Sequence, residues 1–63
     1  MQDAIDYAII QHLGNRVNNI TDDQKAGILL ATARYINVWV GKIGLEAAIE
    51  KGLPRADYFY SHL

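Results

Sequence analysis

Apolar residues recur every three or four positions between residues 21 and 43, which is the spacing of one face of an α-helix. The stretch begins with Thr21 and Gln24, which are placed to form a capping box at a helix N-terminus. No proline interrupts the stretch, and Gly41 and Gly44 favour an end near residue 43. The pattern therefore predicts one long helix over about 21–43.

The apolar positions of this stretch cover well over half of the helix circumference when successive residues are turned by about 100°. A helix that is apolar on almost every side is buried on almost every side. We therefore expect a long central helix, covered partly by the rest of the chain and partly by a second copy in a helical homodimer. One face contains Ala26 together with the residues expected to form the dimer seam, which are Leu29, Ala33, Ile36, Val40 and Ile43.

A second helix is predicted over residues 3–13, because large apolar residues align along it at helical spacing. These residues are Ile5, Ile9 and Leu13. The end of this helix has two alternatives: Gly14 can end it in a left-handed conformation, or it can continue to Val17 and stop at residues 18–19. Residues 15–21 are then a short loop, which places this helix antiparallel to the central one.

Residues 45–51 favour a short helix that Gly52 ends. Pro54 suits the first turn of a further helix, because its fixed φ fits there and its missing N–H needs no partner. The expected fold class is all-α, a small three- to four-helix domain in which the C-terminal helices close the far end. No repeat, linker or strand pattern divides the chain, so we expect residues 1–63 to form a single domain.

A chain of 63 residues buries a small core, and chains of this size are usually stabilised by disulfides, a metal or a partner subunit. The absence of cysteine excludes disulfides and thiolate zinc sites. His12 and His62 are far apart in the sequence and belong to no spaced ligand set, so we expect no metal and no cofactor. By elimination, a homo-oligomer is expected, most simply a dimer.

The charges argue against a membrane or a secreted location. The first ten residues carry acid where a signal peptide needs basic charge. Residues 26–45 are apolar over about one bilayer width, but Arg34 lies near their centre, where insertion is unfavourable by roughly 2.5–3.5 kcal/mol. We therefore expect a soluble, cytoplasmic protein.

Aromatic residues are numerous for so short a chain, and aromatic residues with a polar tip are enriched at protein interfaces. The three at 58–60 cannot all face one core, because successive helical side chains point about 100° apart. Tyr35 and Trp39 lie one turn apart and have an alternative interpretation as core or dimer seam. The residues predicted to contact a partner protein are Arg55, Tyr58, Tyr60 and Trp39.

Basic residues in the second half of the chain support an alternative, a nucleic-acid interface. The residues in question are Arg34, Lys42, Lys51 and Arg55. The helix at 45–51 and the segment from Pro54 resemble the layout of a helix-turn-helix. The net charge of −1 opposes this interpretation, because binding to phosphates favours basic chains.

No constellation of serine, cysteine or histidine residues suggests an activated nucleophile, and there is no glycine-rich phosphate loop, so we expect that the protein is not an enzyme. The leading hypothesis is a small cytoplasmic protein–protein interaction module. Such a chain would be a regulator or inhibitor that docks on a larger protein, as is typical of phage and mobile-element accessory proteins. The alternatives are a dimeric helix-turn-helix-like DNA-binding regulator and a structural subunit of a larger assembly.

Overall fold

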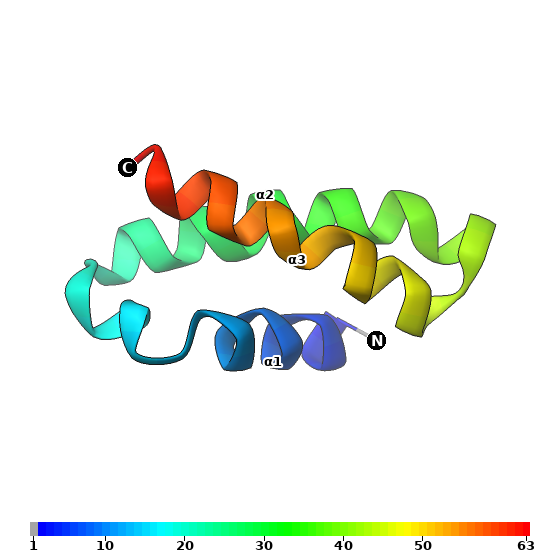
Figure 1. The fold of residues 1–63 in the computed structure, drawn as a ribbon, viewed down its shortest axis with the longest axis horizontal. Coiled ribbons are helices and arrows are strands. Elements are labelled where there is room, and N and C mark those ends of the chain that lie inside the picture. Colours follow the sequence, from blue (N-terminus) through cyan, green and yellow to red (C-terminus); the bar gives the residue numbers. More distant parts are fainter. Residues whose placement is uncertain (1) are drawn as a thin grey trace.

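The computed structural model describes residues 2–63, which form three α-helices and one 3₁₀-helix and contain no strand (Figure 1). The all-α prediction is therefore confirmed for the described chain. The elements are α1 (Gln2–Leu13), the 3₁₀-helix η1 (Gly14–Asn19), α2 (Asp22–Ile43) and α3 (Leu45–Ser61).

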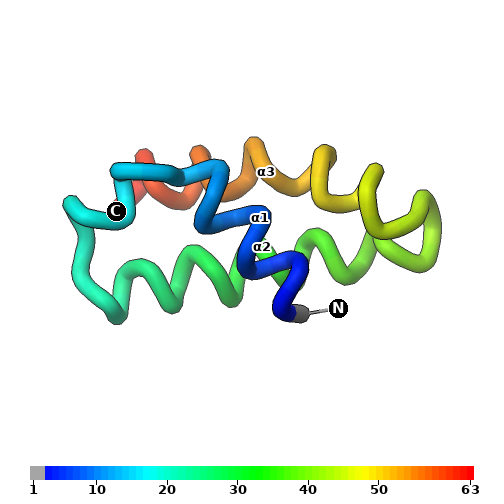
Figure 2. Tube along the Cα trace, turned by 90° about the horizontal axis from the view of Figure 1, so that it is seen from below, coloured from blue at the N-terminus to red at the C-terminus, as the bar shows by residue number. Residues whose placement is uncertain are grey.

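The three α-helices pack against one another, and α2 and α3 share the most extensive interface. Helix α3 runs back antiparallel along α2, and α1 lies obliquely across one side of this pair (Figures 1 and 2). The long helix predicted over about 21–43 is present as α2, but α2 is one of three mutually packed helices, so its central position is not confirmed. The C-terminal part of the chain runs along α2, whereas it was expected to close the far end.

The beginning of α2 has the predicted capping box. The Gln24 amide donates to Thr21 Oγ1 at 3.0 Å, and the Thr21 amide donates to Gln24 Oε1 at 2.9 Å. At its other end Gly44 has φ +89°, a conformation that L side chains rarely adopt, and its N–H donates to the Val40 carbonyl at 2.9 Å. This glycine turn joins α2 directly to α3.

The connection after α1 combines both predicted alternatives. The α-helix stops at Leu13, and Gly14 follows with φ +57°. The chain then continues as η1 to Asn19, where a loop was expected. Arg16 stabilises this junction, because its side chain donates to the Leu13 and His12 carbonyls, both at 3.1 Å, and so satisfies acceptors at the end of α1.

Helix α3 is continuous, so the prediction of one helix ending at Gly52 and another beginning at Pro54 was wrong. Proline inside a helix removes one backbone hydrogen bond and is locally unfavourable. Gly52 is buried, and a Cβ placed there would overlap the side chain of Ile36. Gly52 therefore allows α3 to approach α2 closely, and this packing extends the helix through residues that are usually helix stops.

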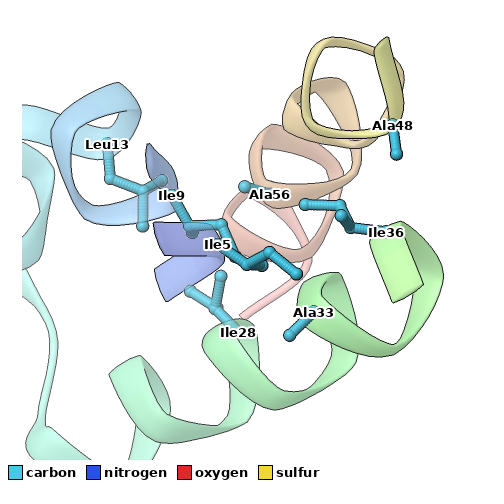
Figure 3. Close-up of a cluster of buried hydrophobic side chains, with 8 residues drawn as sticks. All are labelled: Ile5, Ile9, Leu13, Ile28, Ala33, Ile36, Ala48 and Ala56. Carbon is cyan, nitrogen blue, oxygen red and sulfur yellow. The ribbon is translucent and has the colours of Figure 1, made fainter. Parts of the chain in front are cut away.

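The core lies where the three helices meet (Figure 3). The predicted row on α1 is buried, and α3 contributes small side chains. Thr32 is buried with its apolar neighbours and has no exposed surface. The buried hydrophobic residues are Ile5, Ile9, Leu13, Ile28, Ala33, Ile36, Ala48 and Ala56.

The face of α2 that was predicted to be apolar is only partly buried. Ala33 and Ile36 are in the core, Leu29 and Val40 are half-buried, and Ala26 is exposed. The difference arises because α1 and α3 approach α2 from two directions and meet near Ile36, so the ends of the predicted face lie outside their contact. No helix in the described part of the chain is long and apolar enough to cross a membrane.

Candidate binding face on helices α2 and α3

Two lysine side chains lie over the ring of the only tryptophan. Lys42, on the last turn of α2, places Nζ 5.0 Å from the centroid of the Trp39 ring. Lys51, on α3, places Nζ 4.5 Å from the same centroid. Both distances fall within the range in which a cation is attracted to an aromatic face.

An arginine makes a similar arrangement one turn further along α3. The Arg55 guanidinium carbon lies 4.9 Å from the Tyr35 ring centroid and 5.8 Å from that of Tyr58. The contact with Tyr35 joins α2 to α3, as the Lys51 contact does, and the contact with Tyr58 lies within α3. We refer to the six residues together as the cation–aromatic face: Tyr35, Trp39, Lys42, Lys51, Arg55 and Tyr58.

The spacing of these residues explains how the face forms. On α2 they occupy positions 35, 39 and 42, and on α3 they occupy positions 51, 55 and 58. Both sets follow the i, i+4, i+7 spacing that aligns side chains along one side of a helix. Because α2 and α3 are antiparallel, the two rows meet in opposite order, which places Arg55 beside Tyr35 and Lys51 beside Trp39.

Acidic side chains of α3 lie on other sides of the helix. Glu50 and Glu46 are one and five residues before Lys51, so they are turned by about 100° and about 140° from it. Asp57 is turned by about 160° from Arg55 and contacts the N-terminal part of the chain. The acidic side chains of α3 are therefore separated from its cations, although the two kinds of residue alternate in the sequence.

The face combines supported rings with exposed charges. Tyr35 and Trp39 are half-buried, and Trp39 packs against the core. Lys42, Lys51 and Arg55 are exposed, and Tyr58 exposes 49% of its surface. The core thus supports the Trp39 ring, and each cation–ring contact at an exposed site contributes about 0.5–1 kcal/mol.

A second polar cluster joins α3 to the end of α1. Asp57 Oδ2 lies 2.9 Å from His12 Nε2, and Asp57 Oδ1 lies 2.8 Å from Arg16 Nη1. The hydrogen bond with His12 lowers the pKa of Asp57 below its ordinary value, partial burial opposes this, and Arg16 and the two positive charges lower it further. Arg16 also lies over the Tyr60 ring, 5.4 Å from its centroid. This cluster has a structural role, because every member holds η1 and α1 against α3.

The structure brings together three of the four residues predicted to contact a partner. Trp39, Arg55 and Tyr58 belong to the cation–aromatic face, whereas Tyr60 is on the other side of α3 with Arg16. The sequence interpretation omitted Tyr35 from this set. The signal for it was its position four residues before Trp39, in the same register as Lys51 and Arg55 on α3.

The residues of the alternative nucleic-acid set are divided. Lys42, Lys51 and Arg55 all belong to the cation–aromatic face. Arg34 is exposed on α2 and is turned by about 100° from Tyr35, away from this face. The predicted partner set and the predicted nucleic-acid set therefore describe one surface, apart from Tyr60 and Arg34.

The residues predicted as a dimer seam differ in their exposure. Ala33 and Ile36 are covered by α1 and α3 within one chain, with 3% and 0% of their surface exposed. Leu29 and Val40 are half-buried, and Ile43 exposes 44%. A second copy could not contact Ala33 or Ile36 unless the core opened.

Within the described residues there is no cavity, and no group of three or more His, Cys, Asp or Glu side chains is arranged to hold a metal ion. The candidate site is accordingly a surface and not a pocket. The chain matches no protein-family model, and comparison with the curated proteins and with the solved structures found no match.

Proposed function

We propose that the protein is a small protein–protein interaction module, a regulator or inhibitor that docks on a larger protein through the cation–aromatic face. The observation that carries the proposal is the meeting of two rows, one from α2 and one from α3, in a single exposed surface of rings and cations. Aromatic residues and arginine are the side chains most enriched among binding hot spots.

Preorganisation supports the same proposal. A long cationic side chain usually loses rotamer freedom when it binds, at a cost of about 0.5–1.5 kcal/mol. Here Lys42 and Lys51 are already held over Trp39, which packs against the core, and Arg55 is held over the half-buried ring of Tyr35. Folding therefore already restricts part of the rotamer freedom that these side chains would otherwise lose on binding, and this favours binding.

The DNA-binding alternative has weaker support. A helix-turn-helix needs two helices separated by a turn, whereas α3 is continuous from Leu45 to Ser61. Phosphate-binding surfaces usually draw on a basic chain, and this chain has a net charge of −1. The face also has only three cations, Lys42, Lys51 and Arg55, for contacts with a duplex backbone.

Self-association remains part of the proposal, on a surface that differs from most of the predicted seam. The exposed large apolar side chains of α2 are Leu30 (57%), Val38 (60%) and Ile43 (44%), of which only Ile43 was in the predicted seam. Leu30 and Val38 are turned by about 80° from each other, and a homodimer would use this side of α2. Mass measured by light scattering across a dilution series, with helicity followed in parallel, tests this. A monomer at every concentration would contradict the dimer, and larger oligomers would favour a structural subunit.

A matched pair of variants tests the proposed function. Arg55→Glu reverses a charge in the cation–aromatic face, and Arg34→Glu makes the same change at an exposed position outside it. Tagged wild-type protein and both variants are photo-crosslinked in a lysate of the source cells, and the captured proteins are identified. We expect one protein to be captured by wild type and by Arg34→Glu and to be lost with Arg55→Glu. Equal capture by all three would refute the proposal, and nuclease-sensitive capture of DNA would favour the alternative.

A further inference from the structure

We infer that the cation–aromatic face binds an acidic helix of its partner, with carboxylates on successive turns. This inference rests on the proposed function and adds the chemistry of the ligand. It is drawn from the positions of the three cations, from the occupancy of the ring faces and from the side of the helix pair on which the face lies.

The three cations are spaced for carboxylates on one helix. Lys51 and Arg55 are one turn apart on α3, so their Cβ atoms are about 6 Å apart. The Lys42 and Lys51 ammonium groups both lie within 5.0 Å of one ring centroid, which places them within about 10 Å of each other. Glutamates at i and i+4 on a partner helix have the same spacing as Lys51 and Arg55.

The arrangement favours carboxylates over nucleobases. Proteins that bind single-stranded nucleic acid offer open aromatic faces on which bases stack. Here Trp39 already has Lys42 and Lys51 over its ring, and Tyr35 has Arg55. A base would have to displace a cation before it could stack, whereas a carboxylate can meet each cation where it lies.

The position of the face also suits a helix. Helix α1 lies across one side of the antiparallel α2–α3 pair (Figure 2). Asp57, on that side, contacts His12 and Arg16, and Arg55 is turned by about 160° from it. The cation–aromatic face is therefore away from α1, where a partner helix could pack along the same pair. The charged side chains of the face are Lys42, Lys51 and Arg55, so its charge is complementary to an acidic helix.

Trp39 provides a direct measurement of binding. It is the only tryptophan in the chain, and two of the three cations lie over its ring. The probe is a synthetic alanine-based helical peptide with glutamates at i, i+4 and i+8, and the control peptide has glutamine at the same positions. Tryptophan emission is titrated with each peptide, with a single-stranded oligonucleotide and with a DNA duplex.

We expect a saturable change in Trp39 emission with the glutamate peptide and none with the glutamine peptide. Binding should weaken as salt rises from about 0.05 M to about 0.5 M, because the screening length shortens. Lys51→Glu should weaken binding roughly tenfold, since a favourable pair becomes a repulsive one. Arg34→Glu has the same change in net charge and should bind as wild type does. Circular dichroism of both variants verifies that they remain folded.

Three outcomes would overturn the inference. These are no saturable change with the glutamate peptide, an equal loss of binding in Lys51→Glu and Arg34→Glu, and saturable binding of an oligonucleotide in place of the peptide. The crosslinking experiment separates this failure from failure of the proposed function. If capture of a protein still depends on Arg55 while the peptide does not bind, the face binds a partner of other chemistry. If capture does not depend on Arg55, the proposed function itself is refuted.

Discussion

Replacing Gly52 with alanine tests the close contact between α2 and α3. A Cβ at this position would overlap Cγ1 of Ile36 and lie 2.9 Å from its Cδ1. Ile36 has no exposed surface, so its side chain has little room to move aside. Forcing a methyl group into a packed core destabilises by about 1–3 kcal/mol, whereas alanine gains about 1 kcal/mol over glycine in helix propensity. We expect Gly52→Ala to lower the free energy of unfolding by about 1 kcal/mol.

The matched control is Gly27→Ala on α2. Gly27 is exposed, and a Cβ there would have no atom within 4 Å. Only the helix propensity changes, so we expect stabilisation by about 0.5–1 kcal/mol. Urea unfolding followed by circular dichroism measures both variants. Replacement of glycine by alanine should therefore lower the free energy of unfolding at position 52 and raise it at position 27.

A double-mutant cycle with Ile36→Ala identifies the cause. This truncation removes the two atoms that the new methyl group would approach most closely, and by itself it should destabilise by about 2–5 kcal/mol. In that background Gly52→Ala should no longer destabilise, because the methyl group enters vacated space. If Gly52→Ala is as stable as wild type while Gly27→Ala is stabilised, the described packing of α3 on α2 is refuted.

Substitutions at three further positions have expected outcomes in the same unfolding assay. Thr32→Val should stabilise by about 1 kcal/mol, because Thr32 Oγ1 is buried without a hydrogen-bond partner among the described residues; destabilisation would show that the hydroxyl is paired. Thr21→Ala should destabilise by about 1 kcal/mol through loss of the capping box, and Thr21→Ser should retain most of it; equal stability of the two would contradict the cap. The pKa of Asp57 is lower in the folded state than its ordinary value of about 3.8. The ionised side chain therefore stabilises the fold fully above that value, and this stabilisation is lost as pH falls through the folded-state pKa. Asp57→Asn should remove this dependence of the unfolding free energy on pH. The effect is below about 1 kcal/mol because the Asp57 side chain is 45% exposed. If wild type and Asp57→Asn had the same profile of unfolding free energy against pH, the ion pairs of Asp57 would be contradicted.

The parts of the fold that follow from local chemistry could be predicted. The capping box of α2 depends on two residues three positions apart, and the buried row on α1 depends on helical spacing alone. The course of α3 could not be predicted in this way. Gly52 and Pro54 are local stop signals, and what overrides them is the contact of Gly52 with Ile36, 16 positions earlier in the sequence.

The candidate site likewise could be predicted only in the parts that depend on local sequence. The aromatic and basic residues were identified from the sequence, but as two competing sets. The two sets lie on one surface because α2 and α3 are antiparallel, and the turn at Gly44 sets the register of the two helices. Tyr58 and Tyr60 could not be distinguished by residue type. They are turned by about 160° from each other on α3, so one joins the cation–aromatic face and the other contacts Arg16.

The two surfaces of α2 make partner binding and self-association separable. The dimer was predicted because the apolar arc of α2 exceeds what one neighbouring helix can cover, but α1 and α3 together cover Ala33 and Ile36. The apolar surface that remains includes Leu30, which is 57% exposed and turned by about 140° from Tyr35. Leu30→Asp should therefore change any self-association seen by light scattering while leaving peptide binding intact, and Arg55→Glu should do the reverse. If one variant removed both properties, the partner's binding site would have to be assembled from two copies of the chain, and the cation–aromatic face of a single copy would be insufficient.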